Sequence, residues 1–158
     1  MKTLLIVVGK TTNKHIESLI SDYIDRLKYF NLSFSLHTIP EIRNNKNMSQ
    51  MQIKDMEGNS VIKLLNDNDW VVLLDEHGQE KTSMEMAEWM RKKMNASIKR
   101  LVFVIGGAYG FSDDVYQRAN EKLSLSKMTF SHQMVRLFFV EQLYRSMTIL
   151  NNLPYHHE

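Results

Sequence analysis

The chain has 158 residues, of which 43% are hydrophobic and 24% charged, with 20 basic residues against 18 acidic ones. This length and composition predict one globular domain, residues 1–158, and exclude a disordered or collagen-like chain. The sequence contains no cysteine, which excludes disulfides, cysteine-based zinc sites, iron–sulfur clusters and thiol nucleophiles. The nearly balanced charge favours no particular class of partner.

The hydrophobic runs of the chain are too short to cross a membrane. The longest are Leu4–Val8, Trp70–Leu74 and Leu101–Ile105, whereas a membrane-spanning helix needs roughly 20 apolar residues. The first run also falls short of the core of a secretory signal peptide, and a glycine and a lysine follow it. We therefore expect a cytoplasmic protein with no membrane contact.

Short apolar segments predict the strands. Three of them are apolar at every position, which is typical of strands buried on both faces of a sheet. The remaining one, Asn31–Ile39, alternates apolar with polar residues. In chain order the predicted strands are Leu4–Val8, Asn31–Ile39, Trp70–Leu74 and Leu101–Ile105. Because helical patterns separate these strands, the sequence predicts an α/β fold, a mostly parallel sheet with helices on both faces.

Apolar residues at helical spacing, together with N-cap residues, predict five helices. They cover residues 16–27, 50–65, 83–94, 113–123 and 131–150. The second and third begin at capping boxes, whose N-cap residues are Ser49 and Thr82. The polar stretch Glu41–Met48 is expected to be a loop, and Gly58 to be a weak point of the second helix.

In open α/β sheets, ligands bind at the carboxyl ends of the strands. This rule singles out three segments: Gly9-Lys10, Leu74–Gly78 and Gly106–Gly110. The last has three glycines directly after a buried strand, which permits positive φ angles and a close approach of a ligand to the backbone. Because its spacing matches neither the dinucleotide fingerprint nor Walker A, we interpret it as a ligand loop of another kind. In the second segment, Asp75 and Glu76 are carboxylates that could face a ribose or a cation.

The segment from Leu123 to Phe130 and the helix that follows it hold further candidates. The segment interleaves three hydroxyls with apolar residues, a pattern that suits either a short edge strand or a wall that holds a flat heterocycle. His132 and Arg136 are four residues apart and therefore share one face of the predicted last helix. His132 either takes part in catalysis or makes a local hydrogen bond at the start of the helix.

The last helix is apolar almost all round. One side of it can face the sheet, but the other needs a partner surface, and a homodimer is the economical explanation. Within this helix, Glu141 and Arg145 predict an exposed ion pair. Beyond it, Tyr155 and His156 suit contact with RNA, unless the tail is a frayed terminus. The neighbouring His156 and His157 cannot share a helix face, so we expect no metal site.

Taken together, these motifs resemble those of the RlmH family of SPOUT-class methyltransferases. The matching segments are Val8–Lys10, Phe103–Gly110, Leu123–Phe130, His132–Arg136, Glu141–Arg145 and Pro154–His156. The resemblance implies a single SPOUT domain whose C-terminal part forms a deep trefoil knot that holds S-adenosyl-L-methionine. It also implies a homodimer that methylates N3 of a pseudouridine in 23S ribosomal RNA within the assembled ribosome.

The resemblance also implies site residues. Those expected to bind the cofactor are Leu74, Gly106, Leu125, Ser126, Lys127, Met128, Thr129 and Phe130. Tyr155 and His156 would contact the substrate, although His157 stands where family members usually carry a lysine or an arginine. For catalysis we assign His132 to accept the N3 proton or orient the base, and Arg136 to stabilise the developing anion. Two other functions stay open: a non-enzymatic nucleotide- or RNA-binding α/β module, and a SPOUT methyltransferase that acts on tRNA.

Overall fold

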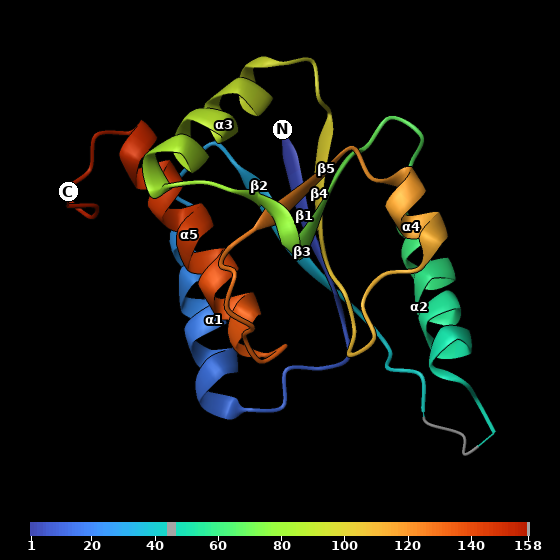
Figure 1. The fold of residues 1–158 in the computed structure, drawn as a ribbon. Coiled ribbons are helices and arrows are strands. Elements are labelled where there is room, and N and C mark those ends of the chain that lie inside the picture. The colour runs from blue at the N-terminus through green and yellow to red at the C-terminus, as the bar shows by residue number, and fades with distance from the viewer. Residues whose placement is uncertain (44–46, 158) are drawn as a thin grey trace.

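The computed structural model describes residues 1–43 and 47–157, and its centre is a five-stranded sheet (Figure 1). The strands are β1 (Lys2–Val8), β2 (Ser33–Ile39), β3 (Trp70–Glu80), β4 (Arg100–Ile105) and β5 (Glu121–Ser124). They lie in the order β2-β1-β4-β3-β5, and all neighbouring strands are parallel. The predicted loop Glu41–Met48 includes residues 44–46, which lie outside the described part of the chain.

Helices cover both faces of the sheet (Figure 1). One face carries α1 (Lys14–Leu27), α3 (Ser83–Asn95) and α5 (Met134–Leu150), and the other carries α2 (Gln50–Leu64) and α4 (Asp113–Arg118). The prediction of a mostly parallel α/β sheet with helices on both faces is therefore confirmed. The trefoil knot stays a prediction. No helix in the described ranges is both long and apolar enough to cross a membrane.

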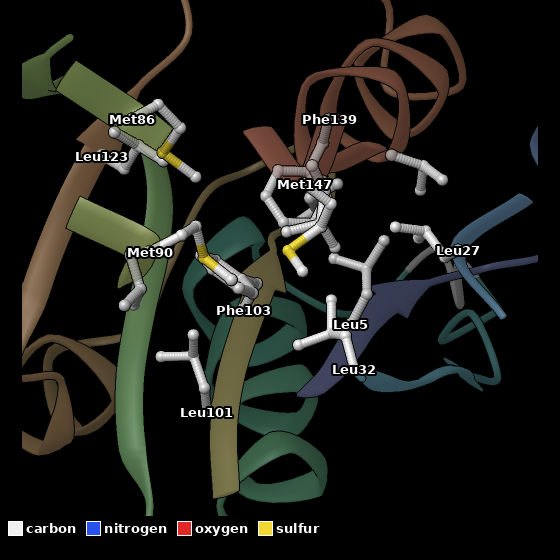
Figure 2. Close-up of a cluster of buried hydrophobic side chains, with 14 of the residues drawn as sticks. Leu5, Leu27, Leu32, Met86, Met90, Leu101, Phe103, Leu123, Phe139 and Met147 are labelled. Carbon is white, nitrogen blue, oxygen red and sulfur yellow. The ribbon is translucent and has the colours of Figure 1, made fainter. Parts of the chain in front are cut away.

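Each face of the sheet has its own hydrophobic core. Figure 2 shows the larger cluster, in which Phe103 of β4 and Leu5 of β1 meet Met90 of α3 and Phe139 and Met147 of α5. Side chains that alternate with these along the strands form the smaller cluster on the other face, with apolar residues of α2 and α4. The central strands are thus buried on both sides, as their uninterrupted apolar sequences predict.

Both predicted capping boxes are present, with Ser49 and Thr82 as the N-caps of α2 and α3. Gly58, interpreted from the sequence as a weak point of α2, lies where this helix contacts α4. A Cβ atom on Gly58 would lie 2.2 Å from the hydroxyl oxygen of Ser112, which is the N-cap of α4. The absence of a side chain therefore allows α2 and α4 to pack closely together.

The third strand does not end at Leu74, as the sequence predicts, but continues to Glu80. Its pairing with β5 is interrupted, because Leu74 and Gln79 both lie opposite Leu123. The four residues between them, Asp75–Gly78, form an outward excursion of the strand. A Cβ atom on Gly78 would lie 2.7 Å from the backbone nitrogen of Leu123, so that only glycine fits where the two strands meet again.

Two predicted helix boundaries are also wrong. The helix predicted over residues 113–123 ends at Arg118, and Leu123 belongs to the edge strand β5. The last helix begins at Met134 instead of Ser131, so that His132 lies in the turn before it. In that turn the Ser131 hydroxyl accepts a hydrogen bond from the Met134 N–H, at 3.2 Å.

The surroundings of α5 remove the sequence argument for a dimer. The helix packs on the sheet between α1 and α3, so that elements of the same chain cover most of its apolar surface (Figure 1). Of its large apolar side chains, Phe138 is the exposed one, at 39%. The homodimer stays a prediction that rests on the resemblance alone.

Candidate functional site

A cavity of about 540 Å³ opens at the carboxyl ends of β3 and β4. Such a volume is typical of sites for small organic ligands. Seven of the eight residues predicted to bind the cofactor line it: Leu74, Gly106, Leu125, Ser126, Met128, Thr129 and Phe130. The strand-end rule thus leads to the same place as the resemblance, although binding by these residues stays a prediction.

The glycine loop after β4 forms one wall of the cavity, and each of its glycines meets a different constraint. A Cβ atom on Gly106 would lie 3.2 Å from the ring of Phe111, and one on Gly107 would lie 2.5 Å from a carboxylate oxygen of the buried Glu57. Gly110 has a φ of +81°, which side chains disfavour. The loop therefore presents backbone to the cavity, as predicted for a ligand loop.

The segment after β5 forms the opposite wall and is held by its own hydroxyls. Ser124 donates a hydrogen bond to the Ser126 carbonyl, and the Ser126 hydroxyl accepts one from the Met128 N–H, both at 2.9 Å. Thr129 donates to a carboxylate oxygen of Glu76 at 3.2 Å, which ties this segment to the excursion of β3. Of the segment Leu123–Phe130, the first two residues belong to the edge strand β5, which ends at Ser124, so the alternative of an edge strand holds for Leu123 and Ser124 and is wrong for residues 125–130.

Lys127 is the one predicted cofactor residue that lies outside the cavity wall. Its side chain is 86% exposed, and its ammonium group lies 3.7 Å from a carboxylate oxygen of Glu80. A contact between Lys127 and a ligand in the cavity would therefore involve its backbone.

The excursion of β3 brings a fixed carboxylate to the cavity. Asp75 accepts a hydrogen bond from the His77 N–H at 2.9 Å and another from the Tyr116 hydroxyl at 2.7 Å. Burial by itself would raise the pKa of Asp75, but these two hydrogen bonds, together with the charges of His77 and Lys122, outweigh it and leave the pKa below its usual value. Burial and the hydrogen bond to Asp75 raise the pKa of Tyr116 to about 12. At neutral pH the pair is therefore a carboxylate and a neutral phenol.

Tyr116 and Phe111 are cavity residues that the sequence reasoning missed. Their rings meet edge to face, with centroids 5.6 Å apart. Neither residue lies at the carboxyl end of a strand. Their contribution depends on where α4 packs, and no local sequence pattern gives that position.

The structure separates the two predicted catalytic residues. His132 lines the cavity, whereas Arg136 lies outside its wall and is 1% exposed. The Arg136 guanidinium donates hydrogen bonds to the carbonyls of Val8 and Gly9, at 2.7 and 2.9 Å, and to the Thr11 hydroxyl at 2.9 Å. Burial lowers the pKa of Arg136, and the charge of Glu41 offsets part of that effect. The premise that His132 and Arg136 share a helix face is wrong, because α5 begins after His132.

Gln133 adds a second connection between the same two segments. Its side-chain oxygen accepts hydrogen bonds from the N–H groups of Thr12 and Asn13, at 3.1 and 2.9 Å, and its amide nitrogen donates to the Thr12 hydroxyl at 2.6 Å. Together, Arg136 and Gln133 bind the loop after β1 to the start of α5. This connection, which we call the α5 anchor, holds the turn that carries His132.

Tyr155 and His156 follow the end of α5, which has 17 residues and is about 25 Å long, and their side chains fold back onto the middle of this helix. The Tyr155 hydroxyl contacts Glu141 at 2.8 Å and Tyr23 at 3.1 Å, and His156 contacts Arg145 at 3.2 Å. Tyr155 and His156 thus pack on α1 and α5, and for these two residues the alternative of a frayed terminus is wrong. The predicted ion pair of Glu141 and Arg145 is present at 2.6 Å, but the expectation that it is exposed is wrong, since the side chains are only 18% and 25% exposed.

The ionisable side chains in the cavity wall set its charge preference. Besides the neutral phenol of Tyr116 they are Asp75, Glu76, His77 and His132, and the lining residues that the structure describes include no lysine or arginine. A phosphate group would meet two carboxylates there without a fixed cation to balance it, whereas a neutral or cationic ligand would not be repelled. In the described ranges no group of three or more histidine, aspartate or glutamate side chains is placed to hold a metal ion.

Comparison with known proteins defines the class of this fold and cavity. A family model described as predicted SPOUT methyltransferase matches residues 1–156. The chain therefore belongs to the SPOUT methyltransferase family and is a methyltransferase, as the resemblance predicted.

Its relatives carry a more specific name. Proteins named ribosomal RNA large subunit methyltransferase H are similar to this chain over 100% of both lengths. Those of Bacteroides thetaiotaomicron, Phocaeicola vulgatus and Flavobacterium psychrophilum are 59%, 58% and 52% identical to it. The resemblance to the RlmH family is thereby confirmed.

Proposed function

We propose that this protein uses S-adenosyl-L-methionine to methylate N3 of a pseudouridine in 23S ribosomal RNA, within the assembled ribosome. Full-length relatives that carry the name of a large-subunit ribosomal RNA methyltransferase are the observation that carries this proposal. We propose further that the chain works in the cytoplasm as a homodimer, and that its single domain contains the C-terminal knot of the family.

The residues of the cavity fit S-adenosyl-L-methionine. The volume of about 540 Å³ suits a nucleoside with an amino-acid extension. The backbone of the glycine loop allows close approach of the ligand. The described wall has two carboxylates and no lysine or arginine, which suits a sulfonium cation better than a phosphate. We propose that Leu74, Gly106 and the segment Leu125–Phe130 hold the cofactor.

When bound, the cofactor supplies a methyl group that is already activated for transfer. The protein must then align the base, exclude water and accept the N3 proton of pseudouridine. His132 is placed for the last task, because it lines the cavity next to the segment that would hold the cofactor. We propose that Arg136 positions His132, because the α5 anchor fixes the turn that carries this histidine. Direct stabilisation of the base by Arg136 would require its three hydrogen bonds to break.

The position of the tail determines how Tyr155 and His156 can reach the substrate. Within one chain neither residue lines the cavity, and their side chains contact Glu141 and Arg145 in the middle and second half of α5 instead. We therefore propose that each tail acts at the cavity of the partner subunit, which makes the homodimer a requirement for methylation.

The test is a transfer assay with radiolabelled S-adenosyl-L-methionine and three acceptors from a strain that lacks the gene: ribosomes, free 23S RNA and tRNA. We expect methylation of ribosomes alone, with the label in methylpseudouridine by mass spectrometry. Labelled tRNA would instead support a methyltransferase that acts on tRNA. Cofactor binding without transfer to any acceptor would support a non-enzymatic binding module.

A matched pair of variants tests the catalytic residue. His132→Ala is expected to lower turnover on ribosomes at least tenfold. His37→Ala, which changes an exposed histidine of β2 outside the cavity, should leave turnover unchanged. If both variants methylate ribosomes like the parent protein, His132 is neither the base nor the group that orients the substrate.

A further inference from the structure

We propose that Asp75 makes the cavity selective for the cationic methyl donor over the neutral product that remains after transfer. This inference rests on the proposed function and adds to it a residue that distinguishes the two forms of the cofactor by charge. Asp75 would thereby promote both the binding of the donor and the release of the spent product.

The first argument is that the Asp75 carboxylate is fixed before any ligand arrives. The His77 N–H binds one of its oxygens at 2.9 Å and the Tyr116 hydroxyl binds the other at 2.7 Å. An ionised carboxylate has about four acceptor positions, and these two hydrogen bonds use only half of them. Because Asp75 lines the cavity, the remaining positions are available to a ligand.

The second argument is that the cavity wall does not neutralise this charge. The other ionisable lining residues are Glu76, His77, Tyr116 and His132, so that no lysine or arginine of the described wall pairs with Asp75. His77 in the wall and Lys122 outside it, on the neighbouring strand β5, favour the ionised form of Asp75. A ligand that carries a positive charge can therefore pair with the Asp75 carboxylate.

The third argument is the charge change of the reaction itself. In methyl transfer the bond between sulfur and the methyl carbon breaks, and its electron pair stays on the sulfur. The N3 electron pair forms the new bond to carbon, and the N3 proton passes to the base. The sulfonium cation thus becomes a neutral thioether, so that its attraction to Asp75 is lost when the reaction is complete. Two unit charges several ångströms apart at a partly exposed site correspond to about a five- to tenfold difference in affinity.

Calorimetric titration of the full-length protein separates this role from others. The probes are S-adenosyl-L-methionine, S-adenosyl-L-homocysteine and sinefungin, an unreactive analogue with an amine in place of the methylated sulfur. In Asp75→Asn we expect about a five- to tenfold loss of affinity for the two cationic probes, and less than a twofold loss for the neutral one. All three probes share the same ribose, so an equal loss for all of them would overturn charge selection in favour of a hydroxyl contact.

Control variants test whether the effect belongs to Asp75. Asp55→Asn removes an exposed charge of α2 outside the cavity and should leave all three affinities unchanged. A change of the affinity ratio in Glu76→Gln but not in Asp75→Asn would overturn the assignment to Asp75.

Two further measurements distinguish failure of this inference from failure of the proposed function. If Asp75→Asn does not fold, the preference of the unmodified protein for the cationic probes must still weaken as salt rises, because salt screens charge interactions. A preference that does not depend on salt would overturn the proposal. If the unmodified protein binds none of the probes, the proposed function itself fails; if it binds them and the ratio does not move in Asp75→Asn, only this inference fails.

Discussion

Replacement of Arg136 by methionine removes the three hydrogen bonds through which α5 holds the end of β1, while keeping a side chain of similar length. The carbonyls of Val8 and Gly9 then lose a charged donor in a buried place. A buried polar group without a partner costs about 1–3 kcal/mol, and release of the guanidinium from its buried site offsets part of the sum. We therefore expect the free energy of unfolding to fall by about 2–4 kcal/mol, a large share of the roughly 5–15 kcal/mol of a typical domain.

Urea unfolding followed by tryptophan fluorescence measures this loss. Trp70 and Trp89 are suitable reporters, because both donate hydrogen bonds to Glu121, at 2.9 and 3.3 Å, and Trp70 begins β3 at the end of the sheet far from Arg136. The control is Arg91→Met, which breaks an exposed pair with Glu88 on α3 and should cost less than about 0.5 kcal/mol.

The same variants separate an anchor from a catalytic arginine. Arg136→Lys keeps the positive charge but not the fork of donors, so that stability and turnover should fall together. If the free energy of unfolding of Arg136→Met lies within about 1 kcal/mol of that of the parent protein, the reasoning from the buried hydrogen bonds is refuted. Loss of turnover in either variant at unchanged stability would instead support direct contact between Arg136 and the base.

Three other predictions follow from the cavity and the tail. Gly107→Ala should lower cofactor affinity at least tenfold by calorimetry, because its Cβ would lie 2.5 Å from Glu57; Gly107→Ala with Glu57→Ala should recover part of the loss, and no recovery would exclude this clash as the cause. The lowered pKa of Asp75 stabilises the folded state above the usual value of about 3.9, so the stability difference between the parent protein and Asp75→Asn should be constant above about pH 5 and disappear as the pH falls through the folded-state pKa. A difference in urea unfolding that does not change with pH over the range in which both proteins fold would contradict it. Deletion of residues 155–158 should abolish methylation of ribosomes and spare cofactor binding, whereas loss of both would indicate a role of the tail in folding.

The parts of the fold that the sequence predicts correctly depend on neighbouring residues. Ser49 and Thr82 cap their helices through contacts within four residues of the chain, and the apolar run Leu101–Ile105 needs only to be buried on both sides. The extension of β3 beyond Leu74 depends on pairing with β5, nearly fifty residues later, and the local sequence of Asp75–Gly78 suggests a turn. Pairing between distant segments therefore overrides the local pattern at the point where the cavity forms.

In the candidate site, too, features set by neighbouring residues could be predicted and features set by distant contacts could not. The glycine loop could be found from its sequence, because glycines after a buried strand are a local signal. The hydroxyls of Leu125–Phe130 suit an edge strand equally well, so that this segment is singled out by the family resemblance. Arg136 could not be interpreted correctly in this way, because its partners Val8 and Gly9 are more than 120 residues away in the sequence. An arginine in an apolar helix has the same sequence signature whether it holds a substrate or a buried backbone.

The α5 anchor also explains how a short chain can hold His132, the proposed catalytic residue, in place outside regular structure. His132 lies in a turn, and turns at the surface are usually the mobile parts of a fold. Here the turn is held on one side by the hydrogen bonds of Ser131 and Gln133, and on the other by Thr129, which binds Glu76. Each of these contacts reaches a different element, so the position of His132 depends on the loop after β1, the excursion of β3 and the start of α5 together. A variant in any one of them should therefore alter turnover without touching the substrate, and His132 should be more sensitive to distant substitutions than a residue within a helix would be.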